Sequence, residues 1–194
     1  YVSKGDNEGQ ERAYKSIELR NGDIIEELRD EVQSFNYDLT IIGGSGKRSM
    51  AHDLVQYIDS SIFVVNNFNR KQTYRILLAV DDSKGNKKAV KFAVRVAQAF
   101  NIEVDIVSIT NEKRVSEKFH SYSHRAEKMM RRTGVKSKVR FVVGDLVDTL
   151  LDVAGNNHII VMGKSSQSPL SKFFLGSKPL AVMESCNCPM VIVK

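Results

Sequence analysis

The stretch Val161-Met-Gly-Lys-Ser-Ser-Gln-Ser-Pro-Leu-Ser-Lys-Phe-Phe-Leu-Gly-Ser177 decides the fold that the sequence predicts. An apolar run that begins at Ile159 ends at Gly163, which predicts a buried strand followed by a polar loop. A loop of Gly and Ser at the carboxyl end of a strand can present bare backbone N–H groups to an anion. In an open parallel sheet, ligands bind at this edge.

Strands and helices alternate on both sides of this stretch. From Arg75 onward, apolar runs typical of strands alternate with segments whose apolar residues recur at helical spacing. Five strands joined by helical crossovers require a parallel, doubly wound sheet. Runs that are apolar throughout, such as Met190-Val-Ile-Val193, agree with this α/β fold because helices cover both faces of such a sheet.

An internal repeat precedes this domain. Three blocks of sequence recur in the same order and at nearly equal spacing. The pairs are Gly22-Asp-Ile-Ile-Glu-Glu-Leu28 with Gly144-Asp-Leu-Val-Asp-Thr-Leu150, Asp38-Leu-Thr-Ile-Ile-Gly43 with His158-Ile-Ile-Val-Met-Gly163, and Ser61-Ile-Phe-Val-Val65 with Pro189-Met-Val-Ile-Val193. The predicted organisation is a loop or disordered terminus at 1–15, a partial copy at 16–66, a linker at 67–73 and a complete domain at 74–194.

The partial copy lacks the first half of the domain and therefore its central first strand. The strand at 39–42 is expected to have an open, apolar edge, which something must cover. We therefore expect that the chain does not exist as an isolated monomer. Because the sequence begins at Tyr1 without Met, we also expect a fragment of a longer protein.

Composition limits the classes of function. The net charge of +6 and the pI of about 9.3 permit contact with acidic partners. The basic run at 128–140 has no interleaved aromatic residues, so nucleic-acid binding is not expected. No apolar run approaches the roughly 18–20 residues that cross a bilayer. Two closely spaced cysteines fit a reducing, cytoplasmic setting.

The loop resembles the nucleotide loop of the universal stress protein family, in which Gly, two residues, Gly, nine residues and Gly-Ser/Thr follow one another. Gly163, Gly176 and Ser177 match in register, and Ser166 stands where the family has its second glycine. Two further stretches resemble the family's opening and closing strands, Ile76-Leu-Leu-Ala-Val-Asp-Asp-Ser83 and Cys188-Pro-Met-Val-Ile-Val193. The resemblance covers 74–194 and implies the five-stranded adenine nucleotide alpha hydrolase-like fold.

The resemblance also implies a site for ATP or AMP. Asp81 and Ile109 are expected to contact the nucleoside, and Asp81 can accept hydrogen bonds from ribose hydroxyls. The residues expected along the phosphates are Gly163, Ser166, Gly176 and Ser177. The alternative for the glycines is tight turning at strand ends. Ser166 and Pro179 depart from the family pattern, and Pro179 removes a backbone donor.

Other motifs are weaker. The Gly-Lys pairs at 163–164 and 46–47 lack the glycine that a P-loop has five residues earlier. His120 and His124 are four residues apart on one helix face, but no nearby carboxylate or thiolate completes a metal site, so no metal is expected. Cys186 and Cys188 are interpreted as buried thiols, with redox activity or metal binding as the alternatives.

Two hypotheses remain for the function. The first is a regulatory domain that binds a nucleotide and acts through homodimer contacts. The second is a cytoplasmic interaction domain that has lost the ligand and belongs to a membrane transporter in the same polypeptide. No catalytic residues are predicted, because the sequence has no Ser-His-Asp or Cys-His arrangement; slow ATP hydrolysis is a minor third option.

Overall fold

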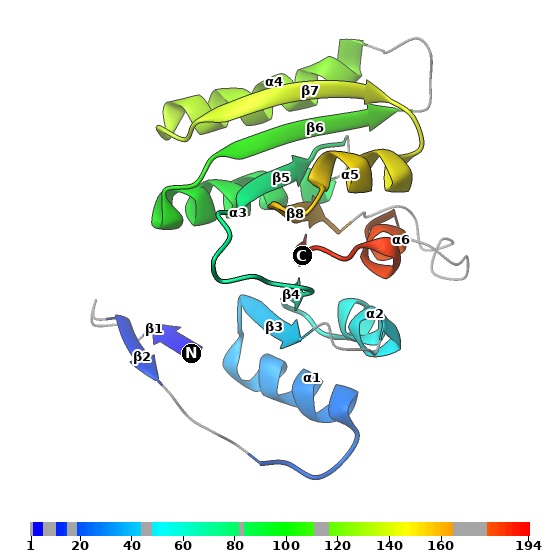
Figure 1. Ribbon diagram of the computed structural model, residues 1–194. Coiled ribbons are helices and arrows are strands. Elements are labelled where there is room, and N and C mark those ends of the chain that lie inside the picture. Colours follow the sequence, from blue (N-terminus) through cyan, green and yellow to red (C-terminus); the bar gives the residue numbers. More distant parts are fainter. Residues whose placement is uncertain are drawn as a thin grey trace.

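The computed structural model describes residues 2–5, 11–14, 19–43, 48–81, 84–110, 117–164 and 178–194. Within these ranges, seven strands form one sheet in the order β3-β4-β9-β8-β5-β6-β7 (Figure 1). The five strands predicted for the complete domain are all parallel, which confirms the predicted α/β fold. They are β5 (Arg75–Ala79), β6 (Val104–Thr110), β7 (Ser137–Val143), β8 (His158–Gly163) and β9 (Met190–Val193).

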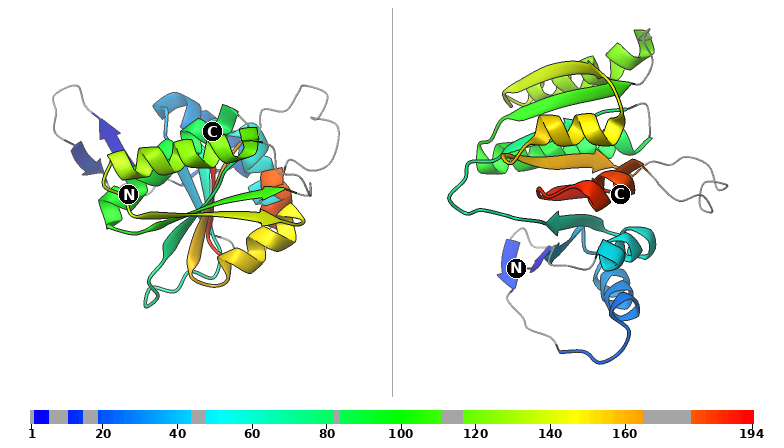
Figure 2. Two further views of the ribbon diagram at one scale, coloured as in Figure 1. Left: turned by 90° about the horizontal axis from the view of Figure 1, so that it is seen from above. Right: turned by 45° about the vertical axis from the view of Figure 1, so that its right-hand side comes forward.

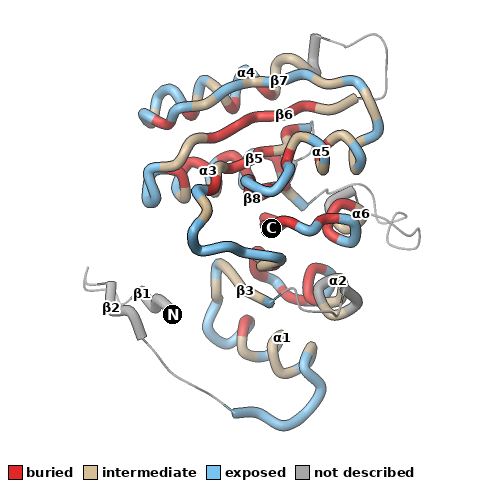
Figure 3. The backbone as a smooth tube through the Cα atoms, in the orientation of Figure 1, coloured by how far each residue is buried: buried red, intermediate tan, exposed pale blue. Residues whose placement is uncertain are grey.

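Helices cover both faces of the sheet. Residues of α3 (Lys84–Phe100) and α4 (Glu117–Arg132) pack into one core layer, and residues of α5 (Leu146–Ala154) and α6 (Lys178–Ser185) pack into the other. The view from above shows α4 and α5 on opposite sides of the strands (Figure 2). The buried residues concentrate in the central strands, as the continuous apolar runs predicted (Figure 3).

The segment predicted to be a partial copy adds two strands to the same sheet. Its elements are α1 (Ile24–Phe35), β3 (Leu39–Gly43), α2 (Arg48–Tyr57) and β4 (Ser61–Val65). Their order matches that of α5, β8, α6 and β9, and α1 and α2 pack into the same core layer as α5 and α6.

The helices α1 and α5 begin in the same way. Asp23 Oδ1 accepts from the backbone N–H groups two and three residues later, at 2.9 and 3.2 Å. Asp145 Oδ1 does the same for α5, at 2.8 and 3.2 Å. Each carboxylate satisfies N–H groups that have no partner within the helix, and it lies at the positive end of the helix dipole. The repeated Gly-Asp of the sequence is therefore a repeated helix cap.

β4 and β9 pair antiparallel, and this pair joins the strands of residues 39–65 to the strands of residues 75–193. Phe63 pairs with Val191, and these two residues hold the same position in the two matching sequence blocks. The pairs on either side, Ile62 with Ile192 and Val64 with Met190, exchange the flanking positions. The junction therefore has a local twofold arrangement centred on Phe63 and Val191.

β3 lies at the edge of the sheet, with β4 as its one strand neighbour among the described residues. This is the edge that a missing first strand would occupy. Ile41 on β3 is 61% exposed, although it lies in an apolar strand.

The amino-terminal segment differs from its prediction as a loop. β1 (Val2–Gly5) and β2 (Glu11–Tyr14) pair antiparallel as a separate two-stranded sheet. Strand pairing uses backbone groups, so a polar sequence does not exclude it.

Candidate functional site

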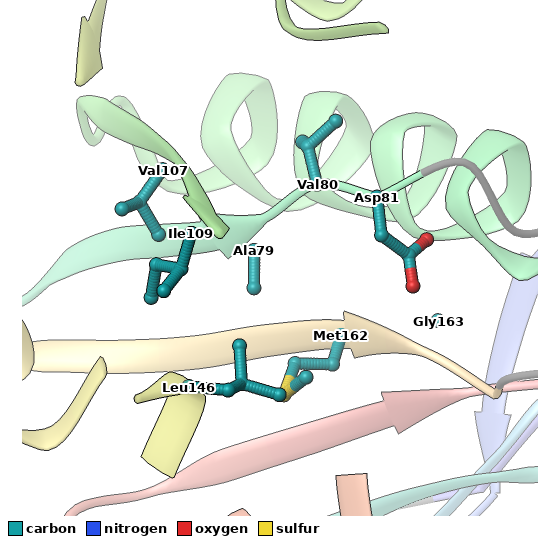
Figure 4. Close-up of a pocket in the computed structure, with 8 residues that line it drawn as sticks. All are labelled: Ala79, Val80, Asp81, Val107, Ile109, Leu146, Met162 and Gly163. Atoms are coloured by element: carbon teal, nitrogen blue, oxygen red, sulfur yellow. The ribbon is translucent and has the colours of Figure 1, made fainter. Parts of the chain in front are cut away.

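A small hollow opens where β5, β6 and β8 end (Figure 4). It encloses about 40 Å³. β5 is the first strand of the complete domain; β6 follows on one side of it and β8 lies on the other. The hollow therefore lies at the point where the strand order reverses, which is the position of ligand sites in open α/β sheets. Its lining comprises Ala79, Val80, Asp81, Val107, Ile109, Leu146, Met162 and Gly163.

Asp81 is the acidic residue of this hollow. It follows the buried Val80, two residues after the end of β5, is exposed, and extends its carboxylate in the direction of Gly163 (Figure 4). The Asn86 side chain, buried in the first part of α3, donates to the Asp81 backbone carbonyl at 2.7 Å. This hydrogen bond fixes the chain direction at the point where it leaves the sheet.

The walls of the hollow are held by buried hydroxyl groups. Ser108 Oγ donates to the Val80 carbonyl at 3.1 Å and shares a short hydrogen bond with Ser123 Oγ on α4. These contacts tie the end of β5 to β6 and to α4. The opposite wall is apolar and consists of Leu146, at the start of α5, and Met162, near the end of β8. The hollow thus combines an apolar interior with a carboxylate at its opening.

Three of the six predicted site residues lie together in this hollow, namely Asp81, Ile109 and Gly163. The other three, Ser166, Gly176 and Ser177, lie outside the described residues. The nucleotide-binding role of all six stays a prediction.

Two lysines lie at the carboxyl ends of the neighbouring strands. Lys164 follows β8, is exposed, and its backbone N–H donates to the Val193 carbonyl at 2.7 Å. Lys194 follows β9, and its ammonium group donates to the Ile58 carbonyl. Burial, with repulsion from Lys164 as a smaller cause, lowers the pKa of Lys194 to about 8. A bound anion near these lysines would raise this pKa, because its charge would offset the repulsion from Lys164.

A buried charge cluster lies at the amino ends of the central strands, opposite the hollow, and the sequence reasoning did not predict it. Asp105 on β6 is 2% exposed and accepts from Arg75 Nε at 2.9 Å and from Arg75 Nη2 at 3.0 Å. His158 Nε2 lies 3.0 Å from Asp105 Oδ2, and Arg75 also pairs with Glu103. The cluster joins the amino ends of β5, β6 and β8, at the opposite ends of these strands from the hollow.

Opposing effects act on this carboxyl group. Burial alone would raise the pKa of Asp105, but the hydrogen bonds from Arg75 and His158 outweigh it and lower that pKa. The hydrogen bond to Asp105 in turn raises the pKa of Arg75. A signal was present in the sequence, because Asp105 is the one charged residue in the buried run from Val104 to Val107.

The histidine pair of α4 has an aromatic neighbour. The ring centroids of His120 and His124 lie 4.3 and 6.0 Å from the ring centroid of Phe141 on β7. Across the described ranges, no group of three His, Cys, Asp or Glu side chains is arranged to hold a metal ion.

Comparisons with known proteins agree on one protein family. The universal stress protein family model matches residues 73–194. Universal stress protein MJ0531 of Methanocaldococcus jannaschii is 22% identical over 153 residues, which cover 68% of this chain and 90% of that protein.

Two solved structures share the fold. A universal stress protein from Archaeoglobus fulgidus DSM 4304 superimposes with a TM-score of 0.66 at 16% identity, over 88% of this chain and 64% of that one. A universal stress protein solved in complex with cAMP superimposes with a TM-score of 0.52 at 22% identity, over 63% of this chain and 99% of that one. In the part of the chain that the structure describes, no helix has the length and apolar character to span a bilayer.

Proposed function

Since the chain belongs to the universal stress protein family, we propose that its complete domain, residues 74–194, is a regulatory domain that binds an adenine nucleotide, ATP or AMP. The observation that carries this proposal is the convergence on one hollow of Asp81, Ile109 and Gly163, which lie at or just after the carboxyl ends of three different strands. Its position at the reversal of strand order supports a ligand site rather than a packing defect. A relative whose structure contains cAMP supports a nucleotide as the class of ligand.

The chemistry of the hollow fits the nucleoside end of such a ligand. The Asp81 carboxylate accepts hydrogen bonds from the two ribose hydroxyls, and the apolar side chains of Ile109 and Met162 contact the base. The phosphates extend past Gly163 toward the glycine-containing loop. Lys164 supplies positive charge at that point, and bound phosphate favours the charged form of Lys194 by opposing the repulsion that lowers its pKa.

Isothermal titration calorimetry with ATP and AMP tests this proposal. We expect Asp81→Ala to weaken binding by about tenfold or more, because two hydrogen bonds to a charged acceptor are lost. Asp152→Asn is the matched control, since Asp152 is exposed on α5 and lies outside the hollow; it should bind as the unaltered chain does. Changing Gly176 and Ser177 together should abolish binding. Absence of binding by the unaltered chain at millimolar nucleotide would overturn the proposal.

The small size of the hollow favours a second candidate function. About 40 Å³ is much less than the several hundred Å³ typical of small-molecule sites. The second candidate is a cytoplasmic domain that binds no nucleotide and regulates a membrane transporter by contact. A negative titration with both nucleotides, together with association with such a transporter, would favour it.

We propose that the chain acts as a homodimer in either case. The edge of β3 supports this, because an apolar edge strand with exposed Ile41 is a template for pairing with another strand. A second copy that places its own β3 there would extend the sheet across the dimer.

A further inference from the structure

Two cysteines lie side by side where α6 leads into β9. Cys186 directly follows α6, Cys188 comes two residues before β9, and Asn187 between them is exposed. Both cysteines are free, and their sulfur atoms are 2.8 Å apart. The Cys188 backbone N–H also donates to Cys186 Sγ at 3.3 Å. The turn therefore holds the two thiols against each other.

Both cysteines belong to the core layer that α5 and α6 cover, so packing accounts for their burial but does not require the two sulfur atoms to touch. Metal binding does not account for the contact either. A structural zinc site needs four ligands, and no third His, Cys, Asp or Glu side chain joins these two among the described residues. The sulfur separation is instead within about 1 Å of the S–S bond length, so a bond forms with a small movement.

We propose that Cys186 and Cys188 are a reversible redox pair that hydrogen peroxide oxidises to an intramolecular disulfide. The Cys186 sulfur attacks one peroxide oxygen, the O–O bond breaks, and Cys186 becomes a sulfenic acid with release of water. The Cys188 sulfur then attacks the sulfenic sulfur, the S–O bond breaks, and a second water leaves as the S–S bond forms. Two thiols lose two electrons and two protons in total, and the peroxide takes up both.

The groups around the two sulfur atoms determine which thiol reacts with peroxide first. The hydrogen bond from Cys188 lowers the pKa of Cys186, which favours the thiolate that reacts with peroxide. The hydrogen bond with Cys186, and then burial, raise the pKa of Cys188, which therefore reacts second. A disulfide across one intervening residue closes a small, strained ring, so thiols reduce it easily.

The turn that holds the two cysteines is hydrogen-bonded to the residues that follow β4. The Asn66 side chain donates to the Cys186 carbonyl at 3.3 Å, and the Asn67 side chain donates to the Asn187 carbonyl at 3.1 Å. Both asparagines directly follow β4. Closing the disulfide moves these two carbonyls, so oxidation reaches the connector between β4 and β5.

The test is oxidation of the folded protein with a small excess of hydrogen peroxide, followed by intact mass spectrometry after acid quenching. We expect the monomer to lose two hydrogen atoms and both free thiols, and dithiothreitol to restore them. A bulky maleimide should react with neither thiol until the protein is unfolded, because the two cysteines are 3% and 7% exposed. Thiols that stay reduced in the folded protein would overturn the proposal, and so would disulfides between chains or sulfinic acids without an S–S bond.

Single variants test the order of attack. Cys188→Ser should accumulate a sulfenic acid at Cys186 that dimedone traps, because the second thiol is absent. Cys186→Ser should react with peroxide at least about tenfold more slowly than Cys188→Ser, because Cys188→Ser keeps the backbone N–H that donates to Cys186 Sγ, whereas burial still raises the pKa of the Cys188 thiol in Cys186→Ser. Circular dichroism identifies a variant that fails to fold, and the alanine variants then replace the serine variants. Equal rates for the two variants would contradict the assigned order.

Discussion

Replacing Asp105 by Asn should destabilise the fold through the buried charge cluster. The substitution keeps the shape of the side chain but removes the charge that balances Arg75, and it changes the acceptor that lies against His158 Nε2. Breaking a buried ion pair costs about 3–5 kcal/mol. The Arg75 side chain is 27% exposed and Asn retains one acceptor oxygen, so we expect a cost near or just below this range, about 2–3 kcal/mol.

Urea unfolding at pH 7 measures this cost. With a slope of about 2 kcal/mol per molar urea, the midpoint should fall by about 1 M or slightly more. Glu103→Gln is the matched control, because Glu103 pairs with the same arginine but its side chain is 40% exposed. Exposed pairs contribute about 1 kcal/mol or less, so this variant should shift the midpoint by less than about 0.5 M.

The pH dependence gives a second measurement. The pKa of Asp105 is lowered in the folded protein, so between the folded and unfolded pKa values the unfolded chain binds more protons. The stability that Asp105 contributes is therefore complete above about pH 4, its ordinary pKa, and decreases as the pH falls below that value. The difference between the unaltered chain and Asp105→Asn should shrink in the same range. A midpoint for Asp105→Asn that matches Glu103→Gln at pH 7 would refute this reasoning.

Three further substitutions test other features of the fold. Asp145→Ala should lower the free energy of unfolding by about 1 kcal/mol, measured by urea unfolding, because α5 loses its cap; an unchanged value would contradict the capping role. Ile160→Ala should cost about 2–5 kcal/mol in the same assay, since Ile160 is fully buried in the central strand β8, and a cost below about 1 kcal/mol would mean that the core closes over the cavity. Ile41→Lys should leave the free energy of unfolding of the monomer within about 0.5 kcal/mol and reduce dimer formation, measured by light scattering; a dimer fraction equal to that of the unaltered chain would exclude the β3 edge as the interface.

The order of strands and helices in the complete domain followed from hydrophobic periodicity and from the crossover rule. Runs such as Ile159–Met162 have no polar face, so they had to lie in a sheet covered on both sides. α5 begins directly after Gly144-Asp145, and in the structure Asp145 caps this helix.

The missed features depend on contacts between distant segments. Nothing local in Phe63 or Val191 specifies that β4 and β9 run in opposite directions, because either direction buries the same side chains. The charge cluster was missed for a related reason, since Asp105 needs Arg75 and His158 from two other strands to become stable in the interior. At the site, the sequence predicted that Asp81 and Gly163 lie at the same edge of the sheet, but not how little space remains between them.

The antiparallel junction has a consequence for communication across the molecule. Because β4 opposes β9, Gly43 at the end of β3 and Gly163 at the end of β8 open toward opposite rims of one continuous sheet. A molecule held at one rim cannot touch the other. An influence of one half on the other can pass along the strands and across the hydrogen-bonded pairs around Phe63 and Val191, or through the core layer that α1 and α2 share with α5 and α6.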